Sequence, residues 1–363
     1  MIVMQPPPLL RDRDLIFTEE GFFFRVLGYW HPPDGFICDP EYTPAKLYDT
    51  TTLMELRERK RGYLKFYGDE GVRFLKETYP QYQIYYKPLQ VNLIGVPIPL
   101  ITDVRRTDLG LKSLLAHSSP DVLQKQTIAL IDFLTDQTVL SPVDLGLFGS
   151  MLAEIHHYSY SDIDLAVYGK SQIQELRSLL ADMYGRKSSF LKNEFEVSVA
   201  TFQAKPSPFK HISRDELIFH QKRKLIYGIV VPDSGRATKV EFEPIRRWDE
   251  IENLHNEVQI EKLGRVMVEA RITDDTDSFF MPSVYNFEVL DVLFGDADKH
   301  TPTKLVSYFE QFRMQAMRDE QVLISGVLEK VTRPHKEYYQ VSLSYGDPDW
   351  TKNVLKLLKI PST

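Results

Sequence analysis

Two aspartates, Asp162 and Asp164, lie one residue apart in the otherwise apolar string "SDIDLAVYG". Because side chains alternate faces along a strand, the two carboxylates share one face, about 7 Å apart, and Ile163, Leu165 and Val167 share the other. Carboxylates that close repel each other, and a hard divalent cation with oxygen ligands removes the repulsion. The pair therefore predicts a Mg²⁺ site, although a bare Asp-x-Asp also fits a surface strand with two solvated aspartates.

A glycine-serine turn, Gly149-Ser150, precedes the aspartates by eleven intervening residues, 151–161, and follows the alternating apolar segment 143–147. Backbone N–H groups at such a turn, together with the serine hydroxyl, can hold a phosphate. A phosphate cradle beside a pair of metal-binding carboxylates is the equipment for phosphoryl or nucleotidyl transfer. The combination favours a transferase site over an unrelated turn followed by solvated aspartates.

The string "FGS", eleven residues, "DIDL" resembles the signature of the DNA polymerase β-like nucleotidyltransferase superfamily, and most of all the minimal nucleotidyltransferase domains of archaea. The resemblance is tight over 143–170 and looser to about 247. The flanking strings "RDRD" and "DDTDSFFMPSVYNF" also resemble an uncharacterised archaeal group that carries this domain. The resemblance implies that Gly149 and Ser150 hold a nucleoside triphosphate, that Asp162 and Asp164 bind two Mg²⁺ ions, and that a third carboxylate on a later strand completes the site.

Three glutamates are candidates for the third carboxylate. Glu241 lies between Val240 and Phe242 in "TKVEFEPI", with Glu243 on the same face, and Glu196 lies in "EFEVSV", which reads as another strand. Glu241 is favoured because its apolar neighbours and its place after a hairpin put it on a late strand, where the superfamily carries this residue. Glu243 and Glu196 stay open as alternatives.

Two features depart from the pattern that the resemblance implies. Many relatives have an arginine soon after the glycine-serine pair, whereas "MLAEIHHYSYS" contains Glu154 and no Lys or Arg, so that His156 and His157 are the available substitutes. The third carboxylate is also Glu rather than the commoner Asp. The expected function is Mg²⁺-dependent transfer of a nucleoside monophosphate from a triphosphate to an acceptor hydroxyl on nucleic acid or protein. The alternative is an inactive module of the same fold that binds RNA or a partner protein.

The sequence around these residues predicts an α/β (α+β) chain. We expect a nucleotidyltransferase-type mixed sheet with flanking helices, plus β-rich N- and C-terminal segments. Amphipathic periodicity predicts helices near 119–136 and 171–185 on either side of the motif. Helices with a glycine break are expected over 51–79. From about 258, alternating strands predict a small antiparallel barrel or sheet, interrupted by a helical piece over 303–319. The expected domains are an α+β domain at 1–106, the nucleotidyltransferase domain at 107–250 and a β-rich domain at 251–363.

Composition limits the class of protein. The 363 residues include a single cysteine, Cys38, which excludes an internal disulfide framework and a cysteine-cluster metal site. The net charge of −7 argues against a protein that coats nucleic acid nonspecifically, because that affinity comes from clustered Lys and Arg. No apolar run approaches the roughly 18 residues of a membrane span, and the N-terminus lacks the features of a signal peptide. A cytoplasmic protein is expected, with a nucleoside triphosphate and an RNA or protein acceptor as partners and no membrane.

Overall fold

The computed structural model describes residues 9–49, 55–57, 62–186, 190–197, 208–232 and 235–360. The chain forms two compact units, and each is assembled from two separate stretches of sequence. The first comprises Met1–Gln172 and Val240–Asn256, and the second comprises Ile173–Lys239 and Glu257–Thr363. Every residue of the predicted site except Glu196 belongs to the first unit.

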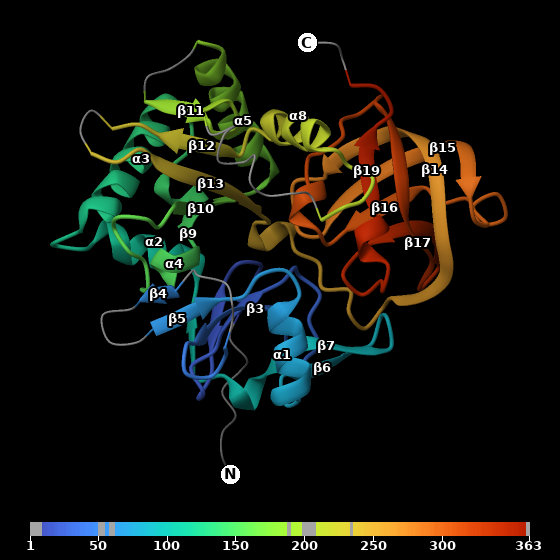
Figure 1. Ribbon diagram of the computed structural model, residues 1–363, viewed down its shortest axis with the longest axis horizontal. Coiled ribbons are helices and arrows are strands. Elements are labelled where there is room, and N and C mark those ends of the chain that lie inside the picture. Colours follow the sequence, from blue (N-terminus) through green and yellow to red (C-terminus); the bar gives the residue numbers. More distant parts are fainter. Residues whose placement is uncertain are drawn as a thin grey trace. The chain divides into compact units, whose positions relative to one another are not determined.

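An eight-stranded sheet is built from the N-terminal part of the first unit (Figure 1). Its main path has the order β4-β5-β3-β2-β1-β8, with β7 paired to β3 and β6 paired to β7. The bounds are β1 (Leu15–Phe17), β2 (Phe23–Val26), β3 (Gly35–Pro44), β4 (Glu55–Arg57), β5 (Gly62–Lys65), β6 (Gln83–Tyr86), β7 (Val91–Pro97) and β8 (Asp103–Arg105). Helix α1 (Glu70–Thr78) buries Leu75 in a core rich in aromatic side chains, among them Phe22, Phe24 and Tyr82.

The motif lies on a second, five-stranded sheet with the order β11-β12-β13-β10-β9. Its strands are β9 (Leu145–Leu147), β10 (Ile163–Tyr168), β11 (Leu191–Asn193), β12 (Tyr227–Val230) and β13 (Thr238–Ile245). Strand β10 runs antiparallel to β9 and parallel to β13, so the sheet is mixed (Figure 1). The helices in this stretch of the chain are α2 (Thr107–Leu115), α3 (Val122–Gln137), α4 (Gly149–Leu152), α5 (Lys170–Gly185), α6 (Glu194–Val197) and α8 (Arg214–Lys224).

Helix α3 shows how local sequence starts an element next to the site. Its N-cap is Asp121, and a capping box joins Asp121 to Gln124 in both directions at 2.9 Å. Leu130 and Leu134 then turn one fully buried face toward the interior. Short 3₁₀ turns complete the described helices, at Ile98–Leu100, Pro142–Asp144, Trp248–Glu250, Glu310–Phe312 and Trp350–Lys352.

The C-terminal strands close into a barrel in the second unit, drawn in orange to red in Figure 1. The order β14-β15-β16-β18-β17 returns to β14 through a β14–β17 pairing, and β19 adds to β17. The strands are β14 (Gln259–Asp277), β15 (Ser283–Phe294), β16 (Lys304–Ser307), β17 (Gln321–Arg333), β18 (Lys336–Leu343) and β19 (Val354–Leu357). Only the β16–β18 pair within this ring is parallel.

The predicted mixed α/β class with β-rich ends is confirmed, as are the helices near 119–136 and 171–185. Three local expectations are wrong. Residues 62–65 form β5 rather than helix, because Tyr63 packs inward against Phe23. Residues 304–307 form β16, because pairing with β15 and β18 overrides the helical spacing of 303–319. The strand expected at "EFEV" is the short helix α6, and the following residues 198–207 lie outside the described part of the chain.

The division into domains at 1–106, 107–250 and 251–363 stays a prediction. The three sheets draw their strands from within those three ranges, whereas the two compact units cut the chain at different points. Among the described residues, no helix is both long and apolar enough to cross a membrane.

Candidate active site

Strand pairing brings the second aspartate next to a glutamate from far along the chain. In the parallel β10–β13 pair, Asp164 is the register partner of Glu241, and Ala166 is the partner of Glu243. Neighbouring strands lie about 4.8 Å apart, so the Asp164 and Glu241 side chains leave the sheet side by side. Asp162 directly precedes β10, and all three carboxylates are half-buried. Register therefore places Glu241 next to Asp164, and the role of Glu241 as the third carboxylate stays a prediction.

The glycine-serine turn lies against the same aspartate. The Phe148 N–H donates to the Asp164 carbonyl at 3.1 Å, which holds the end of β9 to β10. Gly149 has φ +65°, and a Cβ at this position would lie 2.0 Å from Asp164 Oδ2. Only glycine therefore permits the backbone to approach the carboxylate here. The glycine turn, which the sequence spacing predicts to act with the aspartates, therefore lies directly against Asp164.

Glu243 is committed to a buried ion pair. Its carboxylate pairs with the Arg13 guanidinium, and both side chains are almost completely buried. A buried arginine requires a charged partner, since an uncompensated buried charge is costly. Glu243 therefore has a structural task in the interior, whereas Glu241, two residues earlier, is half-buried. Glu196 lies on α6 in the other unit, not on a strand, so register and burial favour Glu241.

Arg13 belongs to a buried polar segment, 11–14, at the start of the chain ("RDRD"). Asp14 accepts hydrogen bonds from the Thr107 N–H at 2.8 Å and from the Arg11 N–H at 3.0 Å. Burial raises the pKa of Asp14 to about 6, against these hydrogen bonds, which lower it. The Arg11 guanidinium lies 3.8 Å from the ring centroid of Tyr168, the last residue of β10. Residues 11–14 therefore contact both strands of the site: Arg11 contacts Tyr168 on β10, and Arg13 pairs with Glu243 on β13.

A lysine from the N-terminal sheet supplies positive charge close to the aspartates. Lys65 Nζ on β5 lies 3.1 Å from Glu41 Oε1 on β3. Glu41 chiefly, then Tyr42, raise the pKa of Lys65 well above its usual value, and Asp164 adds to the effect. Burial alone would raise the pKa of Glu41, but Lys65 and Arg25 outweigh it and lower that pKa to about 2. Sequence reasoning missed Lys65, which no local motif marks.

An apolar cluster explains why the N-terminal sheet reaches the motif. Tyr42 and Tyr63 from that sheet pack in one buried cluster with Phe148, Ala166 and Ile245 from the segments that carry the site. Because the cluster lies within the first unit, the hydrophobic contacts that stabilise this unit also hold the strand that carries Lys65 close enough for Asp164 to affect the pKa of the lysine.

The two histidines after the turn have partners of their own. His156 Nε2 lies 2.9 Å from Asp121 Oδ2, the N-cap of α3. The His157 ring stacks on Tyr160 at 4.1 Å and on Tyr158 at 4.9 Å between ring centroids. These contacts give both histidines structural roles.

The donor set suits Mg²⁺. This ion is usually held by one or two carboxylates together with substrate phosphate oxygens, and Asp162, Asp164 and Glu241 present such carboxylates beside the glycine turn. Throughout the described ranges, no three His, Cys, Asp or Glu side chains already converge into a metal cluster. Two carboxylates completed by the phosphates of a bound nucleotide remain the arrangement that fits, and the two-ion site stays a prediction.

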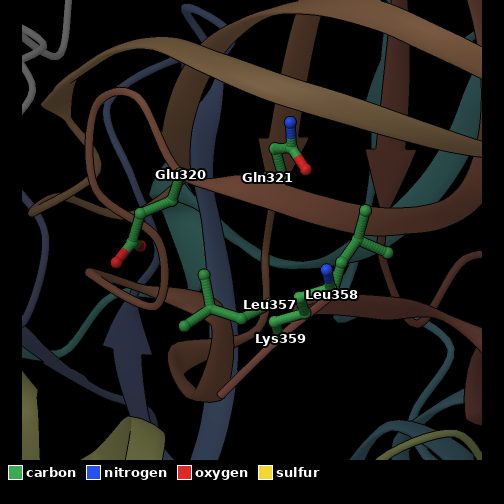
Figure 2. Close-up of a pocket in the computed structure, with 5 residues that line it drawn as sticks. All are labelled: Glu320, Gln321, Leu357, Leu358 and Lys359. Atoms are coloured by element: carbon green, nitrogen blue, oxygen red, sulfur yellow. The ribbon is translucent and has the colours of Figure 1, made fainter. Parts of the chain in front are cut away.

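A shallow pocket on the second unit involves none of the predicted site residues. Figure 2 shows its lining, which joins the start of β17 to the end of β19: Glu320, Gln321, Leu357, Leu358 and Lys359. The Leu358 N–H donates to the Gln321 carbonyl at 3.0 Å across this lining. Glu320 is already paired with Arg223 at 2.6 Å. We therefore interpret the pocket as a packing gap at the end of the β17–β19 strand pair.

Comparison with known proteins gives one informative match. An uncharacterized protein of Methanocaldococcus jannaschii is 27% identical over 337 residues, which cover 91% of this chain and 94% of that protein. No protein-family model matches the chain. No solved structure matches it either.

Proposed function

We propose that the chain is a nucleotidyltransferase that moves a nucleoside monophosphate from a nucleoside triphosphate to an acceptor hydroxyl, with Mg²⁺ as the required ion. The observation that carries the proposal is the register of β10 and β13, which sets Glu241 beside Asp164 where Gly149 also approaches. The sequence pattern, which favours Glu241 over Glu243 and Glu196, and the strand pairing of Glu241 with Asp164 are separate observations that support the proposal.

In this reaction the acceptor oxygen forms a bond to the α-phosphorus while the bond from that phosphorus to the bridging oxygen breaks, releasing pyrophosphate. Gly149 and Ser150 hold the triphosphate tail, and Lys65 contributes positive charge on the side of Asp164. Glu241 orients the acceptor hydroxyl and receives its proton. Bound Mg²⁺ would be held by Asp162 and Asp164 and would neutralise charge on the reacting phosphates.

Pyrophosphate release tests the proposal. The protein is incubated with Mg²⁺, each of the four ribonucleoside triphosphates and total RNA, and the double variant Asp162→Asn/Asp164→Asn is compared with the exposed-site control Asp132→Asn. We expect release by the wild type and the control and none by the double variant. In metal-free buffer the double variant should melt at the same temperature or higher, because a repulsive pair has been removed.

Calorimetric titration with the four nucleotides separates a wrong acceptor from a wrong function. Heat of binding in Mg²⁺ without pyrophosphate release means that the acceptor was missing from the assay. Absence of heat with every nucleotide at millimolar concentration contradicts the proposal.

A further inference from the structure

The closed barrel carries a cluster of cations around one tyrosine, here called the Tyr338 cluster: Lys304, Arg333, Lys336 and Tyr338. Lys304 opens β16, Arg333 closes β17, and Lys336 opens β18. The Nζ atoms of Lys304 and Lys336 lie 5.0 Å and 5.5 Å from the centroid of the Tyr338 ring. Residues of three strands therefore converge on a single aromatic side chain.

Strand register places the cluster on the outside of the barrel. Lys304 is the partner of Gln340, and the next pair along, Leu305 with Val341, is fully buried in the barrel core. Because side chains alternate, Lys304, Gln340 and Tyr338 leave the sheet on the face away from the barrel core. Gln340 is buried there and donates a hydrogen bond to Glu329 at 2.8 Å, whereas Lys304 and Tyr338 are half-buried. Arg333 and Lys336 are themselves register partners at the turn between β17 and β18.

The cluster holds more positive than negative charge. Burial, followed by Arg333 and Lys336, lowers the pKa of Lys304, and the weaker opposing influence comes from Asp277. The nearest carboxylate on β18, Glu337, pairs with Lys330 at 3.0 Å. Three like charges held together are an unfavourable arrangement that a bound anion relieves. This local excess stands out in a chain whose net charge is −7.

A second aromatic pair lies on the other face of β18. The His300 ring lies 4.9 Å from that of Tyr339, the residue after Tyr338, and Tyr339 packs against the barrel core. On the face of the Tyr338 cluster, three cations beside one tyrosine ring suit a ligand that carries both phosphates and flat bases. A duplex buries its bases in its own stack, whereas a single strand can present one to such a ring.

We propose that the Tyr338 cluster binds single-stranded nucleic acid, with Lys304, Arg333 and Lys336 on consecutive phosphates and the Tyr338 ring against a base. Small five-stranded Greek-key barrels often bind oligonucleotides on one outer face, but that is an analogy of fold. The residues carry the inference. It does not depend on nucleotidyl transfer, and it names a site that the proposed reaction does not use.

Fluorescence anisotropy of labelled oligonucleotides tests the inference with the full-length protein. The probes are oligouridylate, oligodeoxythymidylate of the same length and a duplex, each titrated at several salt concentrations. We expect the single strands to bind more tightly than the duplex, with the RNA and DNA arms deciding whether the 2′-hydroxyl contributes. Lys304→Gln/Lys336→Gln should weaken binding about tenfold or more and reduce the salt slope by about 2.

Matched variants separate charge from folding. Lys304→Arg should retain binding because it keeps the cation, and Lys352→Gln, which changes a lysine paired with Asp349 in the same unit, should bind as the wild type does. Tyr338→Leu should weaken every single strand about tenfold. Equal binding of duplex and single strand, or equal losses in Lys352→Gln and the double-lysine variant, would overturn the inference. Since Asp162→Asn/Asp164→Asn should leave these affinities unchanged, a failure of the proposed catalysis is recognised separately.

Discussion

At the scale of single residues, Glu241 and Glu243 have opposite expected roles although they share a strand face. Glu241→Gln should abolish pyrophosphate release and change the free energy of unfolding less than Glu243→Gln does, because Glu241 is half-buried. Glu243→Gln should lower the free energy of unfolding by about 3 kcal/mol, since it removes the closer of the two carboxylates, Glu243 and Asp12, that pair with buried Arg13. Chemical denaturation and the release assay measure the two effects. Glu252→Gln, at an exposed position of the same unit, is the control, and a stable but inactive Glu243→Gln would move the third carboxylate to position 243.

Gly149 permits a second test at this scale. Gly149→Ala adds a Cβ 2.0 Å from Asp164 Oδ2 at a backbone φ of +65°. We expect it to cost about 1–2 kcal/mol of stability, from left-handed strain alone, and to weaken nucleotide binding by displacing Asp164. Gly185→Ala is the matched control because its Cβ would meet nothing within 4 Å. Calorimetric titration measures nucleotide binding by both variants. Unaltered binding by Gly149→Ala would show that the turn is not part of the nucleotide site.

At the scale of elements, the buried 11–14 segment makes stability depend on pH. Burial raises the pKa of Asp14 from 3.8 to about 6, so the folded protein holds this proton to higher pH than the unfolded chain does. Its contribution to stability is therefore complete below about pH 4 and is lost as the pH rises through about 6. Asp14→Asn should reduce the difference in unfolding free energy between pH 4 and pH 7 by about 3 kcal/mol, from about 1.4 kcal/mol per pKa unit. Denaturant titrations at the two pH values measure it, with Asp132→Asn expected to keep the wild-type difference.

The elements also explain which parts of the site sequence reasoning reached. The turn at Gly149 and the aspartates lie within one short segment, where alternation and spacing carry the information. Glu241 required a guess about pairing between distant strands, which apolar flanks supported but could not rank against Glu243. No local sequence pattern marks Arg13 or Lys65 as residues near the site. Their positions depend instead on the packing of an aromatic core between the N-terminal sheet and the segments that carry the site. The helix expected at 303–319 failed for a similar reason, since pairing of β16 on both edges outweighs local periodicity.

At the scale of the whole molecule, the first unit depends on a strand that arrives late in the chain. Strand β13 supplies Glu241 to the site and Glu243 to Arg13, yet it follows the excursion 173–239, which belongs to the other unit. A fragment ending at residue 172 should therefore fail to fold cooperatively. Circular dichroism and thermal melting of that fragment, alone and with a synthetic 240–256 peptide, check this. Cooperative melting without the peptide would contradict the expectation.

The same order of strands has a consequence during synthesis. A ribosome that has just released β10 has delivered the glycine turn and both aspartates, but not the strand that pairs with them. Until Thr238–Ile245 emerges, Asp164 has no neighbouring Glu241 and the early Arg13 has no Glu243. The site of the nascent chain is therefore incomplete while the segment between β10 and β13 is being translated. The arrival of this strand completes the carboxylate set and gives Arg13, already paired with Asp12, its second carboxylate, so assembly of the site is timed by a single strand.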